Sequence, residues 1–174
     1  MMNTRMMLPE EPLRIGITGH IVLSRASFRL VYDELICYLR RLGSRSIVGI
    51  TCLANGADQL FAQAVLAVGG SYEVILPALD YRTAAIPADQ RERFDELLDR
   101  ASGITYTGHE HSGVEAYVAA NRELLQRSQR LLAVWDGADD GEPGGTADVV
   151  DQARRLGLPT TVIWPNGAAR TPDH

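Results

Sequence analysis

The sequence predicts an α/β fold in which a mostly parallel β-sheet is covered by helices on both faces, giving a three-layer, doubly wound arrangement. Short β-branched runs alternate along the chain with helical patterns, and this order of elements builds parallel sheets. Loops that contain glycine separate the runs from the helices. Of the 174 residues, 45% are apolar, which is enough to bury one core, and we therefore expect a single domain over residues 13–165.

The first half of the chain repeats the order strand, loop, helix. The β-branched run 14–18 ends at Gly19, and segment 24–42 has apolar side chains at helical spacing. A turn at Asn55-Gly56 separates the next strand from the next helix. The elements expected here are a strand at 14–18, a helix at 24–42, a strand at 46–52, a helix at 57–68 and a strand at 72–76 closed by Pro77.

The second half resumes this alternation after an irregular stretch that contains proline and aspartate. Gly157 is a typical stop signal for the helix before it. Residues 1–12 and 166–174 carry no periodic pattern, and we expect flexible ends there. The elements expected here are a charged helix at 87–101, a weak edge strand at 104–107, a helix at 113–128, a strand at 130–136, a helix at 146–156 and a last strand at 160–164.

Composition and charge argue against several classes of partner. The 17 basic and 22 acidic residues are interspersed and give a net charge of −5, so binding to nucleic acid or to an anionic membrane is not expected. No apolar run approaches the roughly 20 residues needed to span a bilayer. Cys37 and Cys52 fit no disulfide pattern and no signal peptide is evident, so we expect reduced thiols in a soluble, cytoplasmic protein.

The loops beyond the carboxyl ends of the strands are the expected ligand site, because doubly wound sheets bind ligands where the strand order reverses. These loops are 19–24, 53–57, 79–86 and 137–145. At the end of the last loop, Gly144, Gly145 and Thr146 precede a helix, whose free N–H groups and dipole favour a phosphate. The alternative is that Thr146 only caps the helix while the glycines make a tight turn.

Other loop and helix residues are candidates for the same crevice. Asp58, two residues after Gly56, either caps its helix or accepts a hydrogen bond from a ribose hydroxyl. His20, next to Gly19, either donates to a phosphate or base or is simply solvated. Asn121 falls on the apolar stripe of its helix, so it needs a partner and either holds a loop backbone or shapes the crevice floor.

Charged residues near these loops are less specific signals. Arg122 either clamps an anion or lies on the surface. The loop before Gly144 carries four acids, whose spacing does not match a calcium loop; they either hold Mg²⁺ through phosphate oxygens or are solvated. The His109–His111 pair lacks further ligands, so we expect no metal site of the protein's own. The four acids are Asp136, Asp139, Asp140 and Glu142.

Three segments resemble the SLOG superfamily, a Rossmann-like group that joins the DNA-processing protein A fold to the lysine decarboxylase-like LOG proteins. They are TCLANGADQLFAQAVLAVGGSYEVILP, AANRELLQRSQRLLAVWDG and PGGTADVVDQARRLGLPTTVIWP. The first is similar to the family's G-A-[ID]-D helix and following strand, and the second to its R-N-R helix, with Ala120 at the first Arg position. The third is similar to its G-G-T helix, G-x-P turn and last strand.

The resemblance implies a nucleotide or nucleotide-derived ligand and a homodimer or larger assembly. It implies a phosphate at the Gly-Gly-Thr turn, with the loop acids at the rim of the opening. Salt screens most of the repulsion between the phosphate and carboxylates that lie more than about 8–10 Å away. The residues implied at the ligand are Gly19, Gly56, Asp58, Asn121, Arg122, Gly144, Gly145 and Thr146.

Catalysis is not expected, because the family's phosphoribohydrolases carry G-G-x-G-T-x-x-E, and here Val149 stands three residues after Thr146. The nearest acid, Asp148, is one residue earlier, and this shift turns it about 100° around the helix. We therefore expect binding or sensing without turnover. The alternative is an N-glycosidase acting on a nucleoside monophosphate, with Asp148 as its acid. A third possibility, DNA handling, is disfavoured by the acidic pI of about 5.3.

Overall fold

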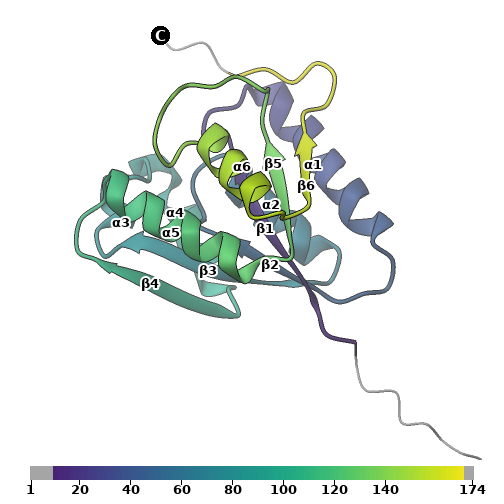
Figure 1. Ribbon diagram of the computed structural model, residues 1–174, viewed down its shortest axis with the longest axis horizontal. Helices are drawn as coiled ribbons and strands as arrows, with labels where there is room; N and C mark the ends of the chain where they lie inside the picture. Colours follow the sequence, from purple (N-terminus) through teal and green to yellow (C-terminus); the bar gives the residue numbers. More distant parts are fainter. Residues whose placement is uncertain (1–9, 171–174) are drawn as a thin grey trace, which may run out of the picture.

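The computed structural model describes residues 10–170 as a six-stranded sheet in which every neighbouring pair of strands is parallel (Figure 1). Most of the predicted flexible ends, at 1–9 and 171–174, lie outside the described residues. The strands are β1 (Leu13–Gly19), β2 (Ile47–Thr51), β3 (Ser71–Ala78), β4 (Gly103–His109), β5 (Arg130–Val134) and β6 (Thr160–Ile163). Their order across the sheet is β4-β3-β2-β1-β5-β6, so the predicted parallel, doubly wound sheet is confirmed.

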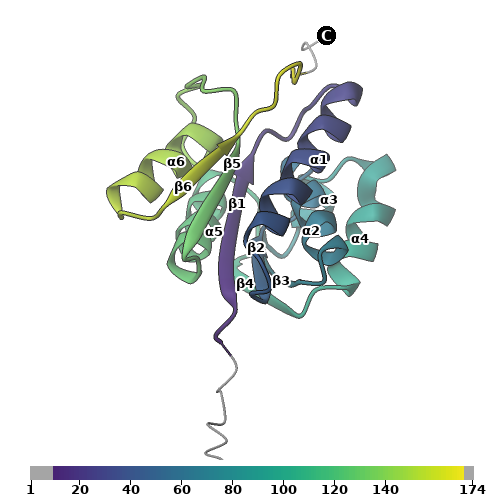
Figure 2. The ribbon, with the colours of Figure 1, turned by 90° about the vertical axis from the view of Figure 1, so that its right-hand side faces the viewer.

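Helices cover both faces of the sheet, as the edge-on view in Figure 2 shows. One face carries α1 (Arg25–Arg41), α2 (Ala57–Ala67), the short α3 (Tyr81–Ala84) and α4 (Arg91–Asp99), and the other carries α5 (Val114–Arg127) and α6 (Thr146–Arg155). Crossovers between parallel strands are right-handed, so their helices change face when the chain reverses its direction across the sheet. The reversal occurs at α5, which returns from edge strand β4 to β5 beside β1.

This reversal opens a crevice between β1 and β5. The two strands are hydrogen-bonded neighbours, from Ile15 beside Arg130 to Gly19 beside Val134. The chain leaves β1 toward α1 on one face and leaves β5 toward α6 on the other. Because the two connections diverge, the space beyond the carboxyl ends of these strands stays open.

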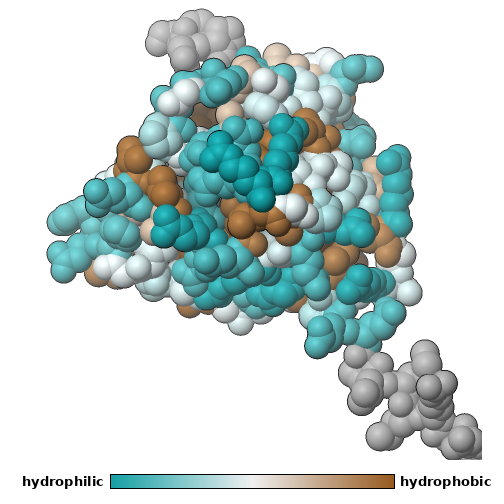
Figure 3. Space-filling view, in the orientation of Figure 1, coloured by the Kyte–Doolittle hydropathy of each residue, from teal (hydrophilic) through white to brown (hydrophobic). Residues whose placement is uncertain are grey.

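The sheet is buried in its centre and exposed at its edge. Ile15, Ile50 and Leu131, on the three central strands, have no solvent exposure. On β4 the residues alternate between half-buried and exposed, which confirms the prediction of an edge strand there. The face that carries α5 and α6 is mainly hydrophilic, with separate apolar patches (Figure 3). Within residues 10–170, no helix is long and apolar enough to cross a bilayer.

The stretch from Pro77 to Ala101 differs from the sequence prediction in three ways. Strand β3 does not end at Pro77 but continues to Ala78, because the register with β4 shifts between Leu76 and Ala78, and proline is tolerated at such irregularities. The irregular stretch before residue 87 contains α3, whose four residues are too few to show a helical period. The helix predicted at 87–101 is a 3₁₀ turn at Ala88–Gln90 followed by α4.

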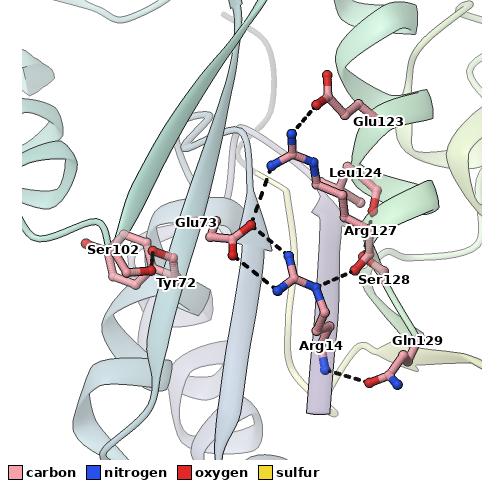
Figure 4. A network of polar contacts seen from close by, with 9 residues as sticks. All are labelled: Arg14, Tyr72, Glu73, Ser102, Glu123, Leu124, Arg127, Ser128 and Gln129. Carbon is pink, nitrogen blue, oxygen red and sulfur yellow. Dashed lines mark hydrogen bonds and ion pairs between the residues drawn. The ribbon is translucent and has the colours of Figure 1, made fainter. Parts of the chain in front are cut away.

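A polar cluster ties the carboxyl end of α5 to the sheet (Figure 4). The Arg14 guanidinium on β1 donates two hydrogen bonds to Glu73 on β3, at 3.1 and 2.7 Å, and a third, at 2.9 Å, to the carbonyl of Arg127. Arg127 itself pairs with Glu73 at 3.5 Å and with Glu123. The cluster therefore fixes the far end of the helix whose other end borders the crevice.

The segment after β6 is attached to α1, in contrast to the flexible end predicted from residue 166 onward. The Ser24 N–H donates to the Ala169 carbonyl at 2.9 Å, and the Ala169 N–H donates to Ser27 Oγ at 2.7 Å. Sequence periodicity does not reveal such an attachment, because the partners are far apart in the chain and the segment has no regular structure of its own.

Candidate ligand-binding site

A cavity of about 880 Å³ lies beyond the carboxyl ends of the strands, at the upper end of the size range of small-molecule sites. Its wall is formed by the loops after β1 and β2, the start of α5, the loop between β5 and α6, and Arg170. Among the residues expected at the ligand, Gly56 and Arg122 do not line the cavity. Those that do are Gly19, His20, Asp58, Asn121, Gly144, Gly145 and Thr146.

The amino end of α6 borders the cavity without a side-chain cap. Gly145, not Thr146, is the N-cap residue, so the alternative in which Thr146 caps the helix is wrong. The Gly145 N–H already donates to the Glu142 carbonyl at 3.0 Å, and so the glycines shape the turn. Among the described residues, the N–H groups of residues 146–148 have no acceptor. These three donors, at the positive end of the helix dipole, are the groups that can meet an anion.

Two side chains hold this turn in place. The Asn121 amide donates from Nδ2 to the Gly144 carbonyl at 2.9 Å, which supplies the partner that its place on the apolar stripe requires. Asp148 Oδ2 accepts the Gly144 N–H at 2.8 Å and Gln152 Nε2 at 3.0 Å. Asp148 is not among the residues that line the cavity. Its carboxylate therefore ties the loop to the helix and is engaged away from a ligand.

Asp58 is a buried carboxyl in the cavity wall. Its Oδ2 accepts hydrogen bonds from Thr51 Oγ1, the Cys52 N–H and the Ala54 N–H, at 3.2–3.3 Å. Burial raises the pKa of Asp58 to about 7, although these hydrogen bonds act in the opposite direction. Oδ1 accepts no hydrogen bond from the described residues. Asp58 therefore fixes the loop after β2 and keeps one oxygen available to a ligand.

The loop that Asp58 fixes contains a strained residue that the sequence did not indicate. Leu53 has a φ of 53°, the only positive φ of a non-glycine residue in the described part of the chain. Its side chain is fully buried, and its N–H donates to Thr51 Oγ1 at 3.0 Å. Residues in this region of conformational space cost of order 1–3 kcal/mol and cluster at ligand sites.

Gly19 and Gly56 allow two loops to approach each other closely. A Cβ on Gly19 would lie 2.6 Å from the Ala57 Cβ and 2.8 Å from the Val134 carbonyl oxygen. A Cβ on Gly56, whose φ is 78°, would lie 2.6 Å from the His20 carbonyl oxygen. Gly56 therefore acts through packing and not as part of the cavity wall.

His20 is buried against the loop after β5, so the alternative in which it is simply solvated is wrong. The Asp136 N–H donates to its Nε2 at 3.2 Å, and its ring meets Trp164 edge-on. Asp136 Oδ1 also lies 3.1 Å from Nε2, a contact that favours a protonated ring. Burial and then Arg170 lower the pKa of His20. The neutral ring that accepts the Asp136 N–H is therefore the state at neutral pH.

Three of the four acids of the loop after β5, Asp136, Asp139 and Asp140, contact other groups of the protein, so these three are not simply solvated. Asp136 and Asp140 both form ion pairs with Arg170. Partial burial alone would raise the pKa of Asp136, but hydrogen bonds from Arg170 and the Ala138 N–H outweigh it and hold the pKa at about 2. Asp139 Oδ1 accepts the Gly141 N–H at 2.8 Å. Within the described chain, no group of three or more His, Cys, Asp or Glu side chains could hold a metal ion.

Exposed apolar side chains form another part of the wall. Ile21 and Val22, after β1, are 58% and 45% exposed, and Val114, at the start of α5, is 54% exposed. Tyr81 and Tyr117 line the cavity beside them, with ring centroids 6.3 Å apart. These apolar positions were predicted only as parts of helices and loops. Arg122, next to Asn121, is exposed because one helical step turns it toward solvent.

No protein-family model matches the chain, and no curated protein matches it. The fold, however, is shared with solved structures. DNA processing protein A from Streptococcus pneumoniae superposes with a TM-score of 0.62 at 13% identity, over 87% of this chain and 50% of that one, so the chain spans half its length. The molybdenum cofactor binding protein from Rippkaea orientalis superposes with a TM-score of 0.58 at 17% identity, over 88% and 77%.

The molybdenum cofactor carrier protein from Chlamydomonas reinhardtii has a TM-score of 0.56 at 17% identity, over 87% of this chain and 76% of that one. The chain therefore shares the Rossmann-like fold of these three proteins, which confirms the fold that the three sequence segments implied.

Proposed function

We propose that the crevice between β1 and β5 binds a nucleotide or nucleotide-derived ligand, and that the protein binds or senses this ligand without turning it over. The observation that carries the proposal is the uncapped amino end of α6 in the wall of a cavity at the point of strand reversal. Phosphate is the group that such a helix end suits best.

The rest of the wall suits the remainder of a nucleotide. Ile21, Val22 and Val114 offer apolar surface to a planar ring. Asp58 Oδ1 offers an acceptor to a sugar hydroxyl or ring N–H. The solved structures described above as binding or carrying molybdenum cofactor support small-molecule binding on this fold, and a pterin-type relative of a nucleotide is included in the proposed ligand class.

The contacts of Asp148 favour binding over the N-glycosidase alternative. A glycosidase carboxyl must approach the anomeric carbon, whereas Asp148 Oδ2 is held by the Gly144 N–H and by Gln152. Val149, at the position of the catalytic glutamate in the resembling enzymes, is 1% exposed. Mg²⁺ bound together with the phosphates is compatible with the proposal, as no side chain of the protein has to supply a complete coordination shell.

The proposal extends to a cytoplasmic homo-oligomer. Ile104 and Tyr106, on the exposed side of edge strand β4, are 47% and 50% exposed and offer apolar surface to a second copy. Light scattering of the purified protein tests the assembly, and a monomeric mass at every concentration would contradict it.

The test of ligand binding is a panel of nucleoside mono-, di- and triphosphates, incubated with the protein, ultrafiltered and chromatographed. We expect one class to be retained intact. Gly145→Asp, which places a carboxylate at the helix end, should abolish retention, and Gln126→Glu, which adds the same charge at an exposed position of α5, should not. Free base in the filtrate that disappears in Asp148→Asn would establish the glycosidase instead. Retention of no member of the panel would overturn the nucleotide proposal.

A further inference from the structure

Arg170 is the only lysine or arginine among the described residues that line the cavity. It belongs to the segment after β6, whose attachment through Ala169 to Ser24 and Ser27 holds it in place beside the crevice. Asp140 and Glu142, from the loop before α6, line the same cavity. The only lysine or arginine in the described part of the cavity wall therefore shares that wall with two acids of the loop that leads into the amino end of α6.

The Arg170 guanidinium forms ion pairs with two carboxylates of this loop. It donates from one terminal nitrogen to Asp136 Oδ1 at 3.0 Å and from the other to Asp140 Oδ2 at 3.1 Å. Its Nε lies 2.9 Å from Asp136 Oδ2, in ion-pair distance, but the Nε–H is not directed at an acceptor among the described residues. The Arg170 and Asp136 side chains are 32% and 25% exposed, so water only partly screens the pair.

Without this guanidinium, the loop would place uncompensated negative charge beside the amino end of α6. Repulsion between like charges is stronger near a protein surface than in bulk water. Asp136, like most aspartates, would be ionised at neutral pH. The acids would then oppose the attraction that the helix end exerts on a phosphate.

We propose that Arg170 sets the charge selectivity of the cavity: by pairing with Asp136 and Asp140, it allows the acidic loop to accept a phosphate-bearing ligand. This inference rests on the proposed nucleotide function. Removal of the guanidinium weakens binding of a nucleoside monophosphate and leaves binding of the matching uncharged nucleoside nearly unchanged. Removal of one of the carboxylates in the same chain restores part of the lost affinity.

The experiment measures dissociation constants by calorimetry for AMP, GMP, CMP and UMP, each beside its nucleoside. Arg170→Gln is expected to weaken the best monophosphate about tenfold, the range of a lost charged hydrogen bond. Its nucleoside should change by less than about twofold. Arg155→Gln, which removes the same charge from an exposed position on α6, is the matched control and should bind as wild type does. Arg170→Gln combined with Asp140→Asn should recover about threefold or more.

The outcomes separate this inference from the function on which it rests. Wild-type protein that binds none of the eight compounds, and none of the di- and triphosphates of the panel described above, overturns the nucleotide function and, with it, the role of Arg170. Wild-type binding that Arg170→Gln leaves unchanged overturns the role of Arg170 alone. An equal loss for monophosphate and nucleoside, or a loss that Asp140→Asn does not relieve, also overturns it, because Arg170 would then be a structural tie for the loop.

Discussion

The side-chain amide of Asn121 and the main-chain carbonyl of Gly144 are joined by a hydrogen bond of 2.9 Å, which connects α5 to the turn before α6. Both residues line the cavity. The N–H of the same glycine donates to Asp148 on α6. The backbone N–H and C=O of Gly144 are thus held by side chains of two helices, so the position of the α6 amino end does not depend on a ligand.

Asn121→Ala should loosen this turn. We expect a loss of about 1–2 kcal/mol in the free energy of unfolding, because the substitution removes the donor and leaves a partly buried carbonyl unpaired. Asn121→Asp, which has nearly the same shape but replaces the donor with a carboxylate, should cost at least as much. Urea unfolding measures both, and Gln126→Ala, at an exposed position of the same helix, is the control. An Asn121→Asp variant as stable as wild type would show that the hydrogen bond contributes little to the free energy of unfolding.

Gly19→Ala should be strongly destabilising, by about 1–3 kcal/mol or more, because the new methyl group has no room beside Ala57 and Val134. The matched control is Gly103→Ala on edge strand β4. The nearest heavy atom to the added Cβ there would be the Glu73 Cγ, at 3.8 Å. That control should be neutral or slightly stabilising. Thermal unfolding of both variants checks the difference, and equal melting temperatures would contradict it.

Asp58 should make stability depend on pH in the direction opposite to most carboxylates. Its pKa is about 7 in the folded protein, above the unfolded value of about 3.9. The folded state therefore holds the proton more tightly, and the contribution to stability, full below about pH 4, is lost as the pH rises through about 7.

Asp58→Asn removes this titration and keeps an oxygen acceptor for the loop. The free energy of unfolding of the variant, minus that of wild type, should be larger at about pH 8 than at about pH 5. Urea unfolding at the two pH values measures this change, and Asp33→Asn, at a position whose carboxylate is 65% exposed, serves as the control. A constant difference between wild type and Asp58→Asn would show that the Asp58 pKa is not raised.

Glu73→Gln should weaken the attachment of α5 to the sheet. The Arg14 hydrogen bonds are the main cause that lowers the pKa of Glu73, and we expect a loss of about 1 kcal/mol at neutral pH for this partly shielded cluster. Because the folded pKa is lowered, the contribution is present above about pH 4 and is lost as the pH falls further.

The difference in the free energy of unfolding between wild type and Glu73→Gln should therefore become smaller as the pH falls below about 4. Asp33→Asn, which breaks the exposed pair of Asp33 with Arg29, should cost less than about 0.5 kcal/mol and provides the comparison. Equal costs for the two substitutions in urea unfolding would show that the cluster adds nothing beyond a surface ion pair.

The helices and strands were predictable because their apolar residues repeat locally. The polar position of Asn121 on such a stripe also predicted that it has a partner, but the partner, Gly144, lies on a loop that no local pattern connects to it. The alternative in which Thr146 caps the helix was wrong because the N-cap is defined by backbone angles, and Gly145 adopts them here.

The site residues that sequence reasoning missed depend on contacts that residue spacing does not reveal. Arg170 pairs with Asp136 and Asp140, more than one element away, and lies in a stretch without periodicity. The strain at Leu53 follows from the loop that Asp58 holds, and leucine itself is no signal of a positive φ. For Arg170 the physical cause is tertiary and for Leu53 it is the local geometry of its loop, and neither leaves a trace in residue spacing.

The central place of β1 has a consequence for how the chain folds as it is synthesised. β1 can pair with β2 as soon as both strands have been synthesised and released. Its other edge stays unpaired until β5 has also been synthesised, and pairings between strands so distant in the sequence form slowly. The cavity, whose wall runs from Ile17 to Arg170, is completed later still. A ligand that binds there can give its full stabilisation only to chains translated to that point, so shorter nascent or truncated chains would gain less protection from it.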